Sequence, residues 1–363
     1  MVVRLTEADA LLLDELNKTP IKYGRNRSQG TGPFVLRTEK PDVELESFAR
    51  HYPEPSAISK VVVRTYETPR GAWAAMMRGE IDFLYEVNRD AVDFVEAESR
   101  IETFSFPRPY YIPVIFNIAH PVLGNRAVRQ AINEAIDRQA VVRTALNDRG
   151  KAADGPLWPH HWAYNPAGRT YSYNPDAARV RLDAAGFPLS PGTGSQMPRR
   201  FHFQCLFWAE DPQFERVALV VQKQLFDIGI DAEMIPMTVT EIGERHVAGD
   251  FDAIMVPMAS GRSLDWLYWF WRSPGPGPAA FGRSGYTAAD STLDRLRAAR
   301  SEEETRLAVA DLQRIMYDDP PAAFLVRPDT ARAVDDSFIV PEEKGRDILG
   351  SLWQWRPRSG ADR

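Results

Sequence analysis

The chain has 363 residues, of which 44% are hydrophobic and 26% are charged, and its formal net charge is −6. This length exceeds what one hydrophobic core usually organises, so two lobes are expected. The acidic balance argues against a nucleic-acid-binding protein and against anchoring on an anionic membrane. No apolar run approaches the roughly 18 residues that a membrane-spanning helix needs.

The single cysteine and the first residues exclude two further features. Cys205 stands alone, so no internal disulfide and no cysteine-based zinc site are expected. The first apolar run is interrupted by Thr6, Glu7 and Asp9, and no small-residue cleavage site follows it. We therefore predict that this stretch is not an export signal.

The first third of the chain predicts mainly strands. Gly30, Thr31 and Gly32 resemble a phosphate-binding loop, but no Lys-Ser/Thr follows and the next segment is extended, so we interpret them as a turn. Strand patterns at 34–40 and 43–50 predict a hairpin. Further strands are expected at 59–66, 81–87, 101–106 and 110–118, with helices from Pro69 to Gly79 and near 88–98.

An amphipathic helix is predicted after Asn125, a residue that suits a helix N-cap. Val128 and Ile132 share its apolar face, and the pattern runs on to Leu146 as one helix. A long loop rich in aromatic residues and proline follows at 150–175. A loop of that length inside a compact protein is usually functional.

The next segments alternate between strands and helices, which predicts an α/β unit with a parallel sheet. The strands are expected at 201–208, 230–237 and 251–258, and the helices at 175–185, 212–228 and 240–248. The chain then continues with an aromatic segment at 263–278, helices near 290–300 and 302–317, a strand at 322–328 and an irregular C-terminus.

Four segments together resemble a known family. They are GTGPFVL at 30–36, the helix and RGEIDFLYEV within 70–87, NRAVRQAINEAIDRQAVV at 125–142, and YSYNPDAARVRLDAAGF at 171–187. Their order is similar to that of the extracellular solute-binding proteins of family 5, the peptide- and nickel-binding type that serves ABC importers. The third segment is the most specific of the four.

The resemblance implies an α/β fold of the type II periplasmic-binding-protein kind. Two lobes joined by crossing strands would hold the ligand in a cleft and close by a hinge motion. Mapped onto this chain, lobe I would be 1–110 plus 329–363, and lobe II would be 111–328. The crossings would be the extended segments that begin near Tyr110 and at Ala322.

One departure from the family concerns the N-terminus. Family members carry a longer portion before the Gly-Thr-Gly-Pro turn, which here begins at residue 30. The chain is therefore expected to be N-terminally shortened. The resemblance implies a periplasmic or extracellular location, and a cytoplasmic one if Met1 is the true start.

Candidate ligand-binding residues come from the crossings, the loops and the strand ends. The aromatic candidates have packing as their alternative role, and Asn117 has the support of a turn. Tyr110, Tyr111 and Asn117 lie on the first crossing, where alternate side chains of a strand face the cleft. The others are Trp158 and Trp162 on the aromatic loop, Trp208 at the end of a strand, Asp265, Trp266 and Trp269 in the aromatic segment, and Arg283 after it.

Two of these candidates are charged. The resemblance implies that Asp265 pairs with the amino terminus of a peptide, and its alternative role is a charge at a helix start. Arg283 is suited to bind a ligand carboxylate as a fork, and its alternative is a solvated loop charge. His160 and His161 lack further ligands in sequence, so no metal site is expected.

The function expected from these features is that of the solute-binding component of an ABC importer, acting as a monomer with ABC permease subunits as partners. The solute would be a short peptide, with an oligosaccharide or another organic solute as alternatives. No cofactor, metal or nucleic acid is expected. A ligand sensor without a transport role and a hydrolase remain as alternatives, although no G-x-S-x-G or H-E-x-x-H motif is present.

Overall fold

The computed structural model describes most of the chain as two compact units. The larger unit comprises Met1–Asn17 and Pro109–Pro328, and the smaller one Lys18–Arg108 and Asp329–Arg363. The described residues are 5–12, 32–52, 54–87, 91–192, 197–261, 263–273, 284–341 and 346–359.

The larger unit is built on one mixed sheet. Its strands are ordered β12-β6-β10-β8-β9, with β7 paired to β12 and β11 paired to β6. Strand β8 is parallel to both β9 and β10, which confirms the predicted parallel unit, and the other pairs are antiparallel. The strands are β6 (Tyr110–Phe116), β7 (Gly150–Ala152), β8 (Phe201–Trp208), β9 (Ile230–Met237), β10 (Ala253–Met255), β11 (Met258–Ala259) and β12 (Ala322–Asp335).

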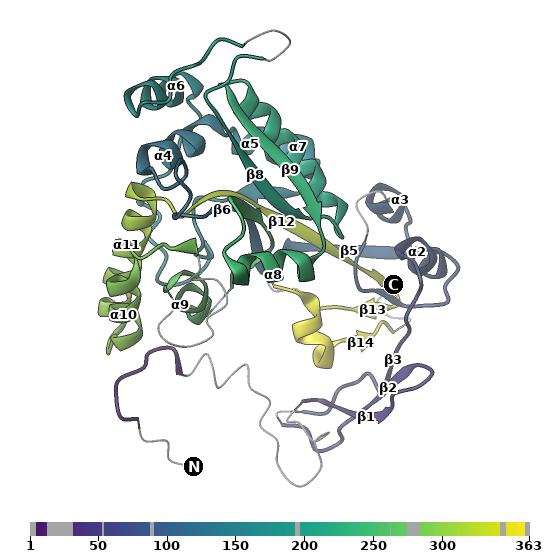
Figure 1. Cartoon of the computed structure of the whole chain (residues 1–363). Helices are drawn as coiled ribbons and strands as arrows, with labels where there is room; N and C mark the ends of the chain where they lie inside the picture. The colour runs from purple at the N-terminus through teal and green to yellow at the C-terminus, as the bar shows by residue number, and fades with distance from the viewer. Residues whose placement is uncertain are drawn as a thin grey trace. The chain divides into compact units, whose positions relative to one another are not determined.

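Helices cover both faces of this sheet (Figure 1). One face packs against α4 (Arg126–Ala135), α5 (Arg138–Leu146), α6 (Pro175–Ala184) and α7 (Pro212–Phe226). The other packs against α8 (Val239–Ala248), α9 (Asp265–Trp271), α10 (Asp290–Ala298) and α11 (Glu302–Asp318). The two cores follow strand alternation: in β6, Ile112 and Val114 face the first core while Tyr111 and Ile115 face the second.

The predicted helix after Asn125 is in fact two helices. The Asn125 side chain caps α4 by accepting from Ala127 N, as predicted. At Ile136 the backbone is extended, and the Asp137 side chain then caps α5 by accepting from Ala140 N at 2.9 Å. The break places Asp137 and Arg138 where they satisfy backbone groups that one continuous helix would not reach.

Helices α4 and α5 hold β12 through buried polar side chains. The guanidinium of Arg129 donates to the carbonyl of Pro320 at 2.9 Å, and the amide of Asn133 donates to the carbonyl of Ala322 at 3.2 Å. The Nε of Arg138 donates to the carbonyl of Phe324 at 2.5 Å, and its Nη2 donates to Asn133 Oδ1 at 2.6 Å. The family-like segment therefore supports the first part of β12.

The described part of the smaller unit has a three-stranded sheet, strands that pair with β12, and a two-stranded C-terminal sheet. Strands β1 (Phe34–Thr38), β2 (Val43–Ser47) and β3 (Lys60–Val63) form an antiparallel sheet, which confirms the predicted hairpin. Strands β4 (Phe83–Leu84) and β5 (Ile101–Pro107) pair with the second part of β12. Helices α2 (Pro69–Met77) and α3 (Val92–Glu96) share an apolar core with that sheet.

The expectation of a strand that ends near Pro328, followed by irregular residues, is wrong. Strand β12 continues to Asp335, and β13 (Phe338–Ile339), the 3-10 helix η3 (Ile348–Gln354) and β14 (Arg356–Pro357) follow. Pro328 pairs with Gly150 and Asp329 pairs with Pro107, so the proline lies where β12 changes partner. Its missing N–H therefore removes little from either ladder.

The first residues pack with the larger unit, whereas the sequence placed them with the smaller one. Leu11 is buried in the second core, and Ala10 N donates to the carbonyl of Arg297 at 2.7 Å. Within the described residues, no helix has both the length and the apolar character needed to cross a membrane.

Candidate functional site

The carboxyl ends of the parallel strands define one edge of the larger sheet. Strands β8 and β9 end together, with Trp208 opposite Met237. The antiparallel strand β6 brings Tyr110 and Tyr111 to this edge, where they pair with Ala259 and Met258 of β11. In open α/β sheets this is the edge where ligands bind, and we refer to it as the carboxyl edge.

Trp208 is half-buried at the carboxyl edge and held by Glu210. The indole Nε1 donates to Glu210 Oε2 at 2.8 Å, and the backbone N of Val239 donates to the same oxygen at 3.1 Å. These two donors lower the pKa of the Glu210 carboxyl. The carboxylate thus ties the end of β8 to the start of α8 and fixes the indole.

Tyr111 belongs to the core of the larger unit and does not face solvent. It is fully buried, and its hydroxyl accepts from Trp271 Nε1 at 3.1 Å. Its ring centroid lies 5.7 Å from that of Phe324, and burial raises the pKa of the hydroxyl. Tyr110, beside it at the start of β6, is half-buried.

Arg327 holds a loop at the same edge, and the sequence did not single it out. It is 5% exposed and donates to Ser260 Oγ at 2.8 Å and to the carbonyls of Gly155 and Leu157 at 2.8 and 2.6 Å. Its guanidinium also lies 5.2 Å from the ring centroid of Tyr111. Ser260 Oγ in turn donates to the carbonyl of Pro156 at 3.0 Å.

The charge of Arg327 is only weakly balanced. Burial lowers its pKa to about 10, against a smaller opposite effect from Tyr111, Tyr164 and Asp154. Its buried Nε has no hydrogen-bond partner among the residues that the structure describes. An arginine inside the apolar run AAFLVRP was the one signal in the sequence that pointed to it.

Helix α9 carries three of the predicted residues. Asp265 is 1% exposed, and its carboxylate accepts from the Ser263 hydroxyl and from Trp266 N, so it stabilises the start of the helix. Trp266 is half-buried and stacks on Phe270, with ring centroids 5.4 Å apart. Trp269 is 53% exposed.

The aromatic loop carries Trp158 and Trp162. Trp158 is half-buried directly after Leu157, which Arg327 holds, and its ring lies 5.2 Å from that of His160. Trp162 is 50% exposed, and the guanidinium of Arg306 on α11 lies 5.4 Å from its ring centroid.

Asn117 is a predicted residue that the structure does not bring to the carboxyl edge. Asn117 follows the far end of β6, where its amide donates to the carbonyl of Phe251 at 2.7 Å and its Oδ1 accepts from Ala119 N at 3.0 Å. These contacts are those of a turn, which was the alternative role. Arg283 lies outside the described residues.

The smaller unit presents an aromatic residue that the sequence did not single out. Tyr85 follows β4 directly and is 62% exposed, and the guanidinium of Arg332 lies 3.8 Å from its ring centroid. Arg332 is itself buried and donates to both oxygens of Asp347 at 3.2 and 2.7 Å. This arrangement holds an exposed ring in a fixed position.

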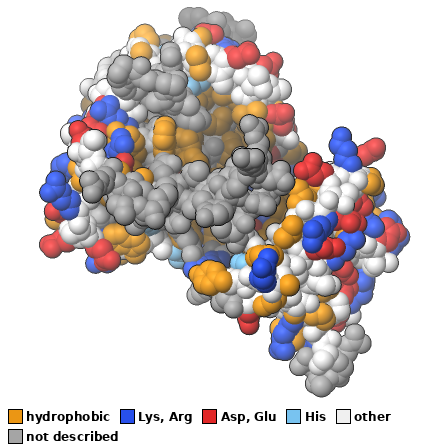
Figure 2. All heavy atoms as spheres, turned by 90° about the horizontal axis from the view of Figure 1, so that it is seen from below, with side chains coloured by type: hydrophobic (Ala, Val, Ile, Leu, Met, Phe, Trp, Pro, Cys, Tyr) orange, Lys and Arg blue, Asp and Glu red, His pale blue; other side chains and the backbone are white. Residues whose placement is uncertain are grey.

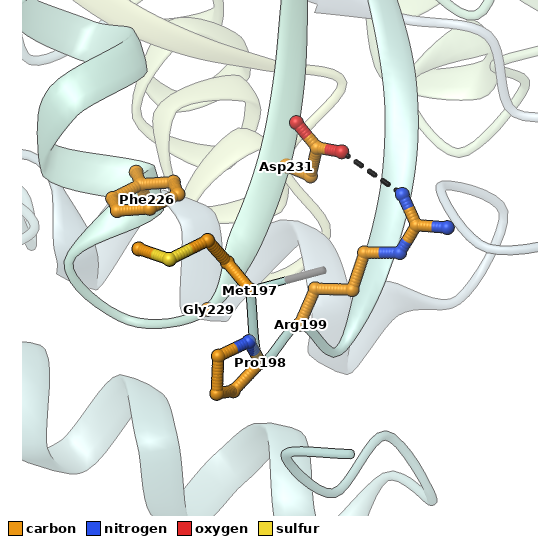
Figure 3. Close-up of a pocket in the computed structure, with 6 residues that line it drawn as sticks. All are labelled: Met197, Pro198, Arg199, Phe226, Gly229 and Asp231. Carbon is orange, nitrogen blue, oxygen red and sulfur yellow. Dashed lines mark hydrogen bonds and ion pairs between the residues drawn. The ribbon is translucent and has the colours of Figure 1, made fainter. Parts of the chain in front are cut away.

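The surface pocket in Figure 3 lies away from the carboxyl edge. It has a volume of about 270 Å³ and is found at the amino ends of β8 and β9. Arg199 and Asp231 pair with each other at 3.1 Å on its wall, and both are largely exposed. It contains none of the predicted residues.

Figure 2 shows acidic and basic side chains mixed over the face it draws, rather than a stripe of one sign as nucleic-acid binders present. Over the described ranges, no three His, Cys, Asp or Glu side chains gather in a way that would hold a metal ion.

The family follows from comparison with known proteins. Residues 7–278 match the family model described as bacterial extracellular solute-binding proteins, family 5 Middle. The chain belongs to this family.

This family 5 protein spans about half the length of the curated relatives it matches. It is 24% identical to heme-binding protein A of Haemophilus influenzae over 230 residues, which cover 63% of this chain and 41% of the relative. It is 22% identical to the probable D,D-dipeptide-binding periplasmic protein DdpA of Escherichia coli K12 over 304 residues, which cover 82% of this chain and 56% of the relative.

Solved structures confirm the expected fold class. The family 5 protein has a TM-score of 0.82 and 15% identity to a putative peptide-binding protein AppA of Clostridium difficile, covering 97% of this chain and 76% of the other. For NikZ of Campylobacter jejuni in complex with Ni(L-His), the TM-score is 0.76 and the sequence identity is 20%, covering 92% of this chain and 70% of the other. These neighbours have the type II periplasmic-binding-protein fold.

Proposed function

We propose that this protein is the solute-binding component of an ABC importer and that its solute is a small organic molecule, a short peptide in the first instance. The observation that carries the proposal is the family match over residues 7–278. Relatives and structural neighbours are named for binding heme, D,D-dipeptides and glutathione, or hold a nonapeptide or Ni(L-His). Several of these proteins are named for binding a peptide or hold one, so a peptide is the solute that we propose first.

The two compact units would act as the two lobes of the family fold. The larger unit would contribute its carboxyl edge, where Tyr110 and Trp208 present partly exposed aromatic surface. Within the smaller unit, Tyr85 is an exposed aromatic ring that Arg332 supports. Pockets for small molecules are mostly apolar, with a few polar groups that set orientation.

Fixed aromatic side chains suit this task because they lose little freedom on binding. Trp208 is held by Glu210, and Tyr85 rests on a guanidinium that Asp347 holds. A prearranged surface binds with a smaller entropic cost than a mobile one. The contacts of Asp265 favour its role at the start of α9 over pairing with a peptide amino group.

The protein would bind without catalysing a reaction, outside the cytoplasmic membrane, as a monomer that delivers its solute to ABC permease subunits. Family membership supports each of these points except the monomeric state. A solute that remains chemically unchanged after incubation with the protein would agree with them. A peptide that is cleaved would favour the hydrolase alternative instead.

Thermal unfolding with a panel of solutes tests the proposal. The panel contains tri- to pentapeptides, a D,D-dipeptide, glutathione, heme and nickel with L-histidine. A ligand at about 100 times its Kd adds roughly 2.7 kcal/mol to the free energy of unfolding, so a rise of several degrees in Tm is expected for a peptide. A panel in which no member raises Tm would overturn the proposal, and a rise with heme or nickel alone would replace the peptide.

A further inference from the structure

The N-terminal segment makes a compact set of contacts with α10. Asp9 Oδ2 accepts from Nε and Nη2 of Arg297 at 3.0 and 2.8 Å, and Ala10 N donates to the carbonyl of the same arginine at 2.7 Å. Asp9 Oδ1 also accepts from Leu11 N at 3.0 Å. Leu11 is buried in the core that α9, α10 and α11 share. We refer to Asp9, Ala10 and Leu11 as the N-terminal clip.

The clip reaches α9 through Arg297. The guanidinium of Arg297 lies 5.2 Å from the ring centroid of Tyr268, in the middle of α9. The hydrogen bonds that Arg297 donates to Asp9 and Tyr268 raise its pKa. The Tyr268 hydroxyl also donates to Asp294 Oδ1 of α10 at 3.3 Å.

Helix α9 is short and depends on such contacts. It has seven residues, and a helix of that length is not stable alone in water. Trp271 anchors one side of it through Tyr111, and Arg272 ties its end to both oxygens of Asp294 at 3.1 Å. Tyr268 adds a third contact, because its ring lies beside the Arg297 cation.

We infer that the N-terminal clip positions α9, and that Asp9 is a positioning residue that acts through Arg297 and Tyr268. Helix α9 carries Trp266 and Trp269, so the clip would set the orientation of candidate solute-binding indoles without touching the solute. The consequence for solute affinity rests on the proposed function. The consequence for the order of α9 does not.

Hydrogen exchange of the full chain, measured by mass spectrometry, tests the inference in Asp9→Asn. Asparagine keeps the oxygen that accepts from Leu11 N and removes the charge that holds Arg297. Exposed ion pairs are worth up to about 1 kcal/mol, so we expect the amides of 266–272 to exchange about two- to fivefold faster. The amides of α5 and α7 should be unchanged, and Asp9→Glu should restore the wild-type rate.

Glu7→Gln is the matched control, because Glu7 is an exposed acidic residue of the same segment. It should exchange like the wild type throughout. Leu11→Ala should release the clip and reproduce the faster exchange of α9. Unchanged exchange at 266–272 in both Asp9→Asn and Leu11→Ala would overturn the inference.

The two proposals can fail separately. Faster exchange of α9 with no solute found would support the clip and count against the proposed function. If a solute is found, Asp9→Asn should raise its Kd by about two- to fivefold, and Glu7→Gln should leave it unchanged. A bound solute together with wild-type exchange and wild-type Kd in Asp9→Asn would support the proposed function and overturn the clip.

Discussion

The indole Nε1 of Trp271 donates a hydrogen bond of 3.1 Å to the hydroxyl of Tyr111, and both residues are buried. Trp271 lies at the end of α9 and Tyr111 near the start of β6. Phe324 of β12 packs on both rings, at 5.6 and 5.7 Å between centroids. This contact joins the helix that carries the candidate tryptophans to strands β6 and β12 of the larger unit.

Tyr111→Phe should destabilise the larger unit while keeping its shape. The change removes the acceptor and leaves the buried indole N–H of Trp271 without a partner, which costs about 1–3 kcal/mol of unfolding free energy. Urea unfolding followed by tryptophan fluorescence measures it. Tyr173→Phe, at a tyrosine that is 53% exposed, is the control and should be neutral. Equal stabilities for the two variants would contradict this account of the contact.

Asn133→Leu should destabilise the support of β12. Leucine has a similar volume, but it leaves the carbonyl of Ala322 and the Nη2 of Arg138 each without one partner. Losing hydrogen bonds to a buried charged group costs roughly 3 kcal/mol. The measurement is the urea midpoint at constant slope. A variant as stable as the wild type would show that water replaces both partners.

The segment that contains Asn133 shows how far the sequence alone could lead. Its apolar spacing and the cap at Asn125 predicted a helix there, because both are local features. The break at Ile136 was not predicted, and Arg138 directly after it binds the carbonyl of Phe324, which lies 186 residues further along the chain. Such a partner leaves no trace in local spacing.

The candidate site divides in the same way. The position of Trp208 at the carboxyl end of β8 followed from the strand pattern and a general rule about sheets. The alternation of side chains along β6 was predicted correctly. The sequence could not show that α9 covers the face of the strand that carries Tyr111. Arg327 and Tyr85 were missed because their roles depend on Ser260 and Arg332, which only the fold brings near.

The pKa of Asp154 makes a pH dependence testable. Although part of its surface is exposed, burial by its surroundings raises the pKa of this carboxyl above its ordinary 3.8, against the opposite effect of Arg138 and Arg327. The folded protein then binds this proton more tightly than the unfolded chain does. Its contribution to stability is present below the unfolded pKa and is lost as pH rises through the folded one.

The stability of the wild type relative to Asp154→Asn should therefore fall as the pH rises from about 3 to 7. Urea unfolding of both proteins across that range gives the difference. Glu244→Gln, at an exposed carboxylate of α8, is the control, and its difference from the wild type should change little. A wild type that gains stability over Asp154→Asn with rising pH would show that attraction to the two arginines dominates.

Arg327→Met should release the loop that Arg327 holds. The carbonyls of Gly155 and Leu157 lose their donor, so the loop should open more often, and cleavage after Leu157 by chymotrypsin should rise about tenfold or more. Mass spectrometry of the fragments locates the cut. Lys151→Met, directly across the strand pair from Arg327, is the control and should be cut like the wild type. Equal cleavage in both variants would remove Arg327 from this role.

Native mass spectrometry of the freshly purified protein tests the central claim most directly. A solute-binding protein retains its ligand through purification when dissociation is slow. We predict a species heavier than the 41.0 kDa chain, from which mild activation releases one small organic solute or a set of short peptides. A spectrum of the bare chain alone, unchanged after incubation with each member of the solute panel, would contradict the account.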